Sequence, residues 1–171
     1  MPYNIEFKAI LRNPSAAHAT AKRLSAASPQ ILHQTDVFFS CNDGRLKLRL
    51  FGDGTGELIH YQRADRAEAR RSDYRIATTP DAQVLLEILR GSLREAGTVK
   101  KIRAVYLVGQ TRVHIDQVEG LGDFLEIEVV MKPGQSDAAA QHIAHDLMNE
   151  FGITPNELLS TAYIDLRGAA L

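Results

Sequence analysis

The chain has 171 residues, enough for one domain with a substantial core, and we treat residues 1–171 as a single domain. Twenty Lys and Arg residues against 21 Asp and Glu residues give a formal net charge of -1, which argues against non-specific binding to nucleic acid or a membrane surface. The lone Cys41 excludes an internal disulfide, and no apolar run approaches the roughly 20 residues that cross a bilayer, so we expect a cytoplasmic protein.

Strand-like segments dominate the chain. The first, NIEFKAILR, alternates between an apolar face from Ile5 to Leu11 and a polar face from Asn4 to Lys8. A hairpin turn at residues 42–44 precedes RLKLRLF, which alternates strictly. The predicted strands are 4–12, 31–40, 45–51, 57–63, 73–79, 99–108, 111–118 and 124–131. Eight strands are a number that can close into a barrel.

Helices interrupt the predicted strands. One starts at Asn13-Pro14-Ser15 and runs to about Ala27, and another runs from Thr79-Pro80 through Glu95. Ser136 caps a third, and Thr154-Pro155 begins a short fourth turn. The stretch 65–72 is charged and without periodicity, so we interpret it as a mobile loop.

Almost every predicted strand has one apolar face and one ionic face that carries both signs of charge. An ordinary antiparallel sheet with its polar side in water gives the same pattern on any single strand. The helices at 84–93 and 139–151, however, carry apolar stripes that need an apolar surface to cover. If they cover the apolar faces of the strands, the ionic faces line an interior, and a curled sheet becomes a polar tunnel.

Two glutamates in FLEIEVVM are the sharpest feature of this ionic side. Glu126 and Glu128 point to the same face of a strand, and two like charges that close repel each other. A cation between them would remove the repulsion, and Mg²⁺ and Mn²⁺ prefer oxygen ligands. Lys and Arg on the other strands can hold phosphate oxygens. Together these groups predict a tunnel for a metal and a polyphosphate.

Short motifs along nearly the whole chain resemble those of the CYTH domain, the family of class IV adenylate cyclases, thiamine triphosphatases and inorganic triphosphatases, also called triphosphate tunnel metalloenzymes. The first motif, E-x-E-x-K, departs from the family pattern at Asn4, which replaces the first glutamate and leaves one metal ligand in question. The matching stretches, in chain order, are NIEFK, GRLKLR, LIHYQR, VKKIRAVY, TRVHID and FLEIEV.

The resemblance implies an α+β fold, an eight-stranded antiparallel β-barrel or tunnel with helices packed outside, and a homodimer is compatible with it. It implies that Mg²⁺ or Mn²⁺ is bound by Glu6, Asp116, Glu126 and Glu128. It implies that the triphosphate is bound by Lys8, Lys47, Arg49, Arg63, Lys101, Arg103 and Arg112. We assign catalytic positions to Glu6, Lys8 and Asp116.

Other polar residues have more than one reading. We favour Asp36 as a partner of other charged groups over a base or a simple salt bridge. His33 and His114 suit general bases because histidine titrates near neutrality, yet a structural role is commoner for a histidine on a sheet. Tyr163 either closes one tunnel end or belongs to the core. No set of aromatic residues accompanies the basic pairs, so we expect no nucleic acid as partner.

Two reactions suit such a tunnel. In a cyclase the ribose 3′-hydroxyl of ATP attacks the α-phosphorus and pyrophosphate leaves, whereas in a triphosphatase water attacks the terminal phosphorus. Both depend on positioning and electrostatic stabilisation. The length favours a class IV adenylate cyclase-like enzyme that makes cyclic AMP. An organic or inorganic triphosphatase, of the thiamine triphosphatase or tripolyphosphatase kind, and a non-catalytic triphosphate binder are the alternatives.

Overall fold

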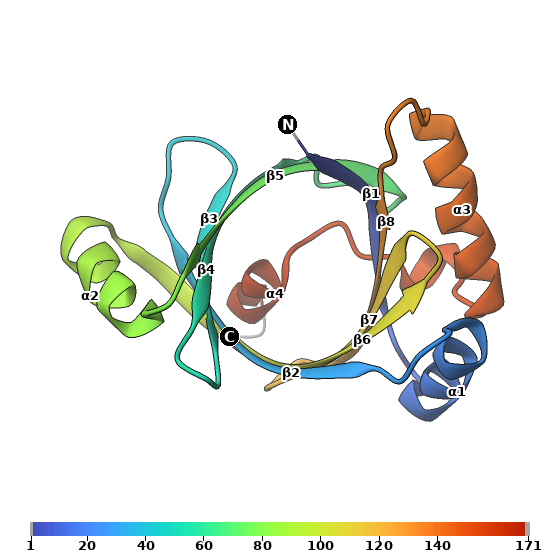
Figure 1. Ribbon diagram of the computed structural model, residues 1–171, viewed down its shortest axis with the longest axis horizontal. Coiled ribbons are helices and arrows are strands. Elements are labelled where there is room, and N and C mark those ends of the chain that lie inside the picture. Colours follow the sequence, from blue (N-terminus) through green and yellow to red (C-terminus); the bar gives the residue numbers. More distant parts are fainter. Residues whose placement is uncertain (1, 170–171) are drawn as a thin grey trace.

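The computed structural model describes residues 2–169, and their eight strands form one closed barrel (Figure 1). Around the barrel the strands follow the order β1-β5-β4-β3-β2-β6-β7-β8, and all neighbours pair antiparallel. The strands are β1 Tyr3–Ile10, β2 Gln30–Phe39, β3 Arg45–Phe51, β4 Gly56–Arg63, β5 Arg70–Thr79, β6 Glu95–Val108, β7 Thr111–Val118 and β8 Gly122–Val130. The predicted fold class is therefore confirmed.

The helices are α1 Pro14–Leu24, α2 Ala82–Ser92, α3 Asp137–Glu150, the short 3₁₀ helix η1 Pro155–Glu157 and α4 Tyr163–Ala169. α1, α2 and α3 lie outside the barrel wall, and α4 lies across one end of it (Figure 1). Asn13, Asp81 and Ser136 cap α1, α2 and α3 by accepting hydrogen bonds from backbone N–H groups of the first turn. No helix within residues 2–169 combines the length and apolar character needed to cross a membrane.

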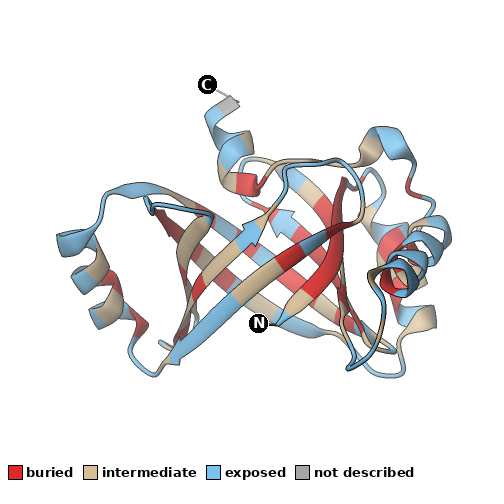
Figure 2. Cartoon of the chain, turned by 90° about the horizontal axis from the view of Figure 1, so that it is seen from above, coloured by how far each residue is buried: buried red, intermediate tan, exposed pale blue. Residues whose placement is uncertain are grey.

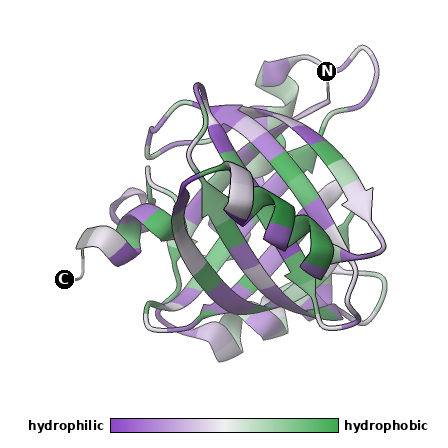
Figure 3. Cartoon of the chain, turned by 90° about the vertical axis from the view of Figure 1, so that its left-hand side faces the viewer, coloured by the Kyte–Doolittle hydropathy of each residue, from purple (hydrophilic) through white to green (hydrophobic). Residues whose placement is uncertain are grey.

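The hydrophobic core lies between the barrel wall and these helices. Its largest part packs the outward residues of β1, β7 and β8, such as Phe7 and Ile127, against α1 and α3. A smaller part packs Leu48 of β3 against Leu86 of α2. Seen from the α2 side, hydrophilic and hydrophobic residues alternate along the strands (Figure 3). Because the apolar faces turn outward to the helices, the ionic faces turn inward.

Burial follows this arrangement (Figure 2): both faces of several strands are buried, whereas the helices keep exposed outer sides. Every residue of β1 from Asn4 to Ala9 is buried, although Glu6 and Lys8 among them are charged. Charged residues at that depth need partners. The interior of the barrel supplies them.

Several predicted boundaries were wrong. β5 begins at Arg70, so only the first part of the predicted loop 65–72 is a loop; antiparallel pairing of β5 with both β1 and β4 overrides the charge of that stretch. β6 begins at Glu95, four residues before the predicted start. α1 ends at Leu24, and α2 spans only Ala82–Ser92, each shorter than predicted. The turn after Thr154 is η1, as predicted, but α4 was not predicted.

Candidate active site

The barrel encloses a cavity of about 360 Å³ whose wall contains the inward residues of all eight strands. Inward side chains of a closed barrel fall into levels, because the strands are inclined to the barrel axis and staggered. The register around this barrel gives four such levels between the open mouth and the α4 end. The levels differ sharply in character.

The level at the mouth is largely apolar, with Leu32, Phe51, Ile76 and Val105 beside Glu57 and Arg112. The two middle levels are ionic and contain both signs of charge. The deepest level, under α4, joins two groups of residues. One is an apolar cluster in which Phe38, Val99, Val118 and Phe124 contact Tyr163. The other is a row of cations, Arg45, Arg63, Arg70 and Lys8.

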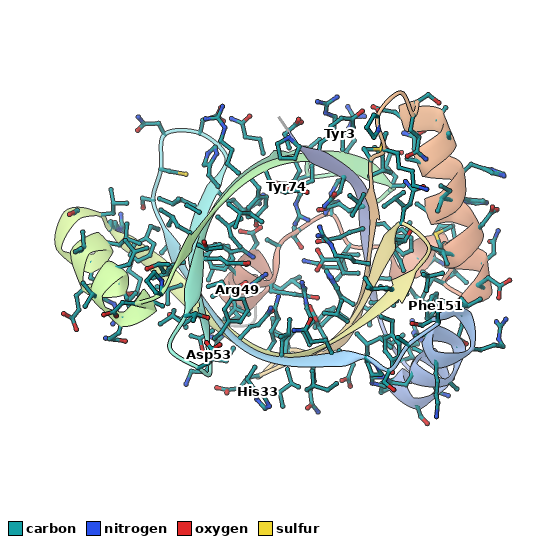
Figure 4. All side chains as sticks on the ribbon, in the orientation of Figure 1. Tyr3, His33, Arg49, Asp53, Tyr74 and Phe151 are labelled. Carbon is teal, nitrogen blue, oxygen red and sulfur yellow. The ribbon has the colours of Figure 1, made fainter. Side chains whose placement is uncertain are left out.

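Asp36 organises the basic side of the middle levels. This carboxylate is buried and accepts hydrogen bonds from Lys47 Nζ at 2.8 Å and from Arg49 Nε and Nη2 at 2.8 and 2.9 Å. Lys101 Nζ lies 3.8 Å away. Burial alone would raise the pKa of Asp36, but Arg49 and Lys47 outweigh it and hold that pKa well below its usual value. Asp36 thus acts as a partner and keeps these cations side by side. In Figure 4 Arg49 points into the barrel.

Arg103, on the neighbouring strand β6, joins two acids. Its Nε and Nη2 donate to the two Asp116 oxygens at 2.7 and 2.6 Å, and Nη2 also donates to Glu126 at 2.7 Å. The Tyr163 hydroxyl donates to Asp116 at 2.9 Å, and Lys101 Nζ lies 3.6 Å from it. Asp116 is fully buried and has both oxygens engaged. Asp116 therefore shares one guanidinium nitrogen with Glu126, and it is not one of the three residues, His114, Glu126 and Glu128, whose potential ligand atoms lie within 4.8 Å of one another.

The glutamates of β8 form the acidic side. Glu126 and Glu128 lie next to His114, and one potential ligand atom of each lies within 4.8 Å of the others. The repulsion between the glutamates is relieved within the chain, because Arg103 pairs with Glu126 and Arg112 Nε donates to Glu128 at 2.9 Å. Burial raises the pKa of Glu126, but Lys8 and Arg103 outweigh it and hold that pKa well below its usual value.

These residues fit a divalent cation. The pKa of His114 is lowered by burial and then by Arg103, which favours the neutral imidazole that binds metals. Among the described residues its buried Nδ1 has no hydrogen-bond partner and faces both glutamates at 3.8 and 3.9 Å. Glu6 is a third carboxyl group on this side, and burial, then Glu126 and Glu128, raises its pKa, which favours the protonated form. Two carboxylates with one imidazole suit Mn²⁺ at least as well as Mg²⁺.

Asn4, where the family motif has a glutamate, lines the cavity and is buried. With its amide oxygen turned toward Arg112, it accepts a hydrogen bond from Nη2 at 3.2 Å. A neutral amide in this place adds no charge to the acidic side. The site therefore concentrates its negative charge on Glu126 and Glu128, whose pKa values are lowered, with Glu6 beside them.

Two lysines of the cavity wall have lowered pKa values. Burial, and after it the neighbouring Arg49, lowers the pKa of Lys47 to about 7. Burial lowers the pKa of Lys8 to about 8, partly offset by Glu126. Lys8 Nζ also lies 3.7 Å from the centre of the Tyr163 ring, a cation–π distance. Both ammonium groups can thus gain or lose a proton near neutral pH.

Nearly all the predicted site residues line the one cavity, namely Glu6, Lys8, Lys47, Arg49, Arg63, Lys101, Arg103, Arg112, Glu126 and Glu128. His33 is exposed and points outside the barrel, whereas Tyr74 points into it (Figure 4). Tyr163 both closes the deep end and belongs to an apolar cluster. Arg70 was missed because its stretch was interpreted as a loop; its place opposite Glu6 on β1 emerges only from strand pairing.

Comparisons with known proteins agree with this geometry. The family model for the CYTH domain matches residues 2–163. The protein named "Putative adenylate cyclase MJ0240" of Methanocaldococcus jannaschii is 20% identical over 172 residues, which cover 96% of this chain and 98% of that protein.

Solved structures show the same fold. The PH1012 protein of Pyrococcus horikoshii OT3 has a TM-score of 0.84 at 23% identity, covering 95% of this chain and 98% of that chain. A "Putative adenylyl cyclase" from Hippeastrum, described as having a dominant triphosphatase activity, has a TM-score of 0.68 at 18% identity, covering 99% of this chain and 96% of that chain.

Proposed function

Because this chain belongs to the CYTH domain family, we propose that it is a divalent-metal-dependent enzyme acting on an organic triphosphate in its tunnel, with class IV adenylate cyclase-like chemistry. The observation that carries the proposal is the ionic interior, where a basic wall built around Asp36 faces an acidic wall built around Glu126 and Glu128. Burying charges of both signs costs desolvation free energy that their pairing with one another repays only in part. A polyphosphate with a cation matches both walls.

The basic wall binds and orients the phosphate chain. Lys47, Arg49, Lys101 and Arg103 come from neighbouring strands and project into the same two levels of the cavity. Charge-assisted hydrogen bonds from guanidinium groups fix phosphate oxygens in direction as well as distance. Asp36 and Asp116, which hold Arg49 and Arg103 in place, act as positioning residues.

The acidic wall would hold Mg²⁺ or Mn²⁺ through Glu126 and Glu128, with His114 and Glu6 beside them. A divalent ion bound there supplies positive charge against the phosphate oxygens, and its charge lowers the energy of the transition state. The chain itself contributes Lys8 at the deep level, where its ammonium group is placed to neutralise a departing pyrophosphate.

The apolar residues at the mouth of the tunnel favour a substrate with an organic group. Leu32, Phe51, Ile76 and Val105 line the tunnel at this level, farther from α4 than the ionic residues. An aromatic or other apolar group would bury surface there while its phosphates reach the cations below, whereas inorganic tripolyphosphate would leave these side chains unused. This arrangement favours ATP-like substrates over inorganic ones.

Product analysis tests the proposal. Purified protein is incubated with ATP, thiamine triphosphate or tripolyphosphate and Mg²⁺ or Mn²⁺, and the products are identified. We expect cyclic AMP and pyrophosphate from ATP, and no turnover after metal removal or in the variant Glu126→Gln/Glu128→Gln. Unchanged turnover in that variant would contradict the metal role. Binding of ATP without any product would mark the protein as a non-catalytic binder.

Hydrolysis of an organic triphosphate is the second candidate. The observation that favours it is the closed deep end, where a terminal phosphate would lie near Lys8, whose pKa of about 8 allows proton transfer near neutral pH. The similarity to the Hippeastrum protein, described as having a dominant triphosphatase activity, supports the same reading. Release of orthophosphate in place of pyrophosphate in the product analysis distinguishes it from cyclisation.

A further inference from the structure

Two buried guanidinium groups at the deep level have hydrogen-bond capacity that the protein leaves unused. Arg70 is 4% exposed, and the side chain of Arg63 is 3% exposed. In each of them Nε and Nη2 are buried and have no hydrogen-bond partner within residues 2–169. Leaving buried donors of a charged group without an acceptor is destabilising. We propose that Arg70, together with Arg63, binds the terminal phosphate of the substrate at the α4 end of the tunnel.

The pairing of the strands brings the two arginines together. Arg70 begins β5 and lies opposite Glu6 of β1, and Arg63 ends β4 opposite Ser72. Arg63 and Ser72 line the cavity, and Arg70 is the next inward position of β5 beyond Ser72. Arg63 Nη1 donates to Glu6 at 2.7 Å, which fixes this guanidinium beside the acidic wall. Arg70 therefore stands directly behind a residue that faces the substrate.

Two covering segments hold Arg70 at this depth. Its Nη1 donates to the backbone carbonyl of Leu159 at 3.2 Å and to that of Arg66. Leu159 belongs to the connection between η1 and α4, and Arg66 to the loop between β4 and β5. Nη1 of Arg70 thus bonds to the protein, whereas Nε and Nη2 have no hydrogen-bond acceptor among the described residues. A buried guanidinium group with a purely structural role would normally have acceptors for its remaining N–H donors as well.

The charge at this end calls for an anion with more than one negative charge. Burial lowers the pKa of Arg70, and the positive charge of Arg63 lowers it further. Lys8 is a third basic group at this end, and burial and Arg63 lower its pKa to about 8. Of the carboxyl groups near them, Glu6 is bound by Arg63, and Glu126 lies opposite Lys8 and raises its pKa. A phosphate group has several acceptor oxygens and fits the planar fork of each arginine.

The position along the tunnel identifies which phosphate this is. The apolar mouth lies at the other end, so a substrate that enters with its organic group at the mouth presents its last phosphate to the deep level. This assignment rests on the proposed function and refines it: the substrate class is a chain of phosphates long enough to reach from the basic wall around Asp36 to Arg63 and Arg70.

Calorimetric titration of tripolyphosphate in the absence of metal tests the inference without turnover. We expect Arg70→Met, which keeps the apolar stem, to weaken binding at least about tenfold. The control is Arg71→Met, since Arg71 is the next residue of β5, faces outward and pairs with Asp73; its affinity should stay within twofold of the parent. Equal affinity in Arg70→Met and the parent, or equal losses in both variants, would overturn the proposal.

Thermal unfolding separates binding from a purely structural role. If Arg70 serves a ligand, ligand-free Arg70→Met melts at or above the temperature of the parent, because a buried unsatisfied charge has been removed. A lower melting temperature with unchanged affinity would assign Arg70 to structure alone. Should Arg70→Met fail to fold, Arg70→Lys keeps the charge without the fork, and its affinity should still fall several-fold. A parent protein that binds no tripolyphosphate would refute the proposed function itself.

Discussion

Replacing Arg103 by Met should destabilise the ligand-free fold strongly. Arg103 is the shared partner of Asp116 and Glu126, which it binds through three hydrogen bonds of 2.6–2.7 Å. In the variant, Asp116 keeps only the Tyr163 hydroxyl at 2.9 Å and Lys101 at 3.6 Å. Asp116 is 0% exposed, so water cannot replace the lost guanidinium.

The expected magnitude follows from this burial. Removing one partner of a buried ion pair costs about 3–5 kcal/mol, because the other charge stays behind uncompensated. The two remaining partners of Asp116 place the loss near the lower limit, about 3 kcal/mol. For a domain of this size the melting temperature would fall by roughly 6–12 °C.

Arg112→Met is the matched control. Arg112 also pairs with a glutamate of β8, Glu128, at 2.9 Å, but its side chain is 38% exposed. An ion pair of this exposure contributes about 0–1 kcal/mol. Urea and thermal unfolding of both variants measure the difference. If Arg103→Met lost no more stability than Arg112→Met, the buried network would not stabilise the barrel as described.

Three further predictions concern the tunnel and its closed end. Lys47 and Lys8 have pKa values of about 7 and about 8, and a triphosphate that contacts them favours their charged forms. Binding should therefore take up protons, and affinity should fall as pH rises above 7. Titration calorimetry in buffers of different ionisation enthalpy measures this proton uptake, and binding without proton uptake would count against these contacts. Arg49→Ala should weaken tripolyphosphate binding by roughly 1.5–3 kcal/mol, whereas Arg71→Ala, which alters an outward-facing residue paired with Asp73, should not. Gly97→Ala should lower the melting temperature, because Gly97 has φ +150° and a Cβ atom would lie 2.6 Å from Ile164 of α4; Gly91→Ala, with open space around it, should not.

The sequence sufficed for the architecture because alternation is a local property. RLKLRLF puts every second residue on one face, and the stripe on α2 needs the apolar face of that strand, so the inward side of β3 had to be basic. The same reasoning brought Lys47, Arg49 and the two glutamates of β8 to one cavity.

The partners of each charge could not be predicted, because they depend on register between strands far apart in the chain. In the sequence, Asp116 lies at an inward position of its strand, as a metal ligand would. Only the pairing of β6 with β7 shows that Arg103 donates hydrogen bonds to both its oxygens. Arg70 lies in a run of charges that contains no periodic signal. Its strand forms because β1 and β4 offer edges on both sides, which is tertiary information.

The pairing of β1 with β8 has a consequence for how the chain folds. Residues 3–10 are made long before residues 122–130, yet one whole side of β1 pairs with them. During synthesis, β1 therefore stays half-paired until most of the chain has left the ribosome. Contacts between such distant segments slow folding. The acids and bases of the interior remain hydrated until that final seam forms, so dehydration of the charges and completion of the ring should occur in one late step.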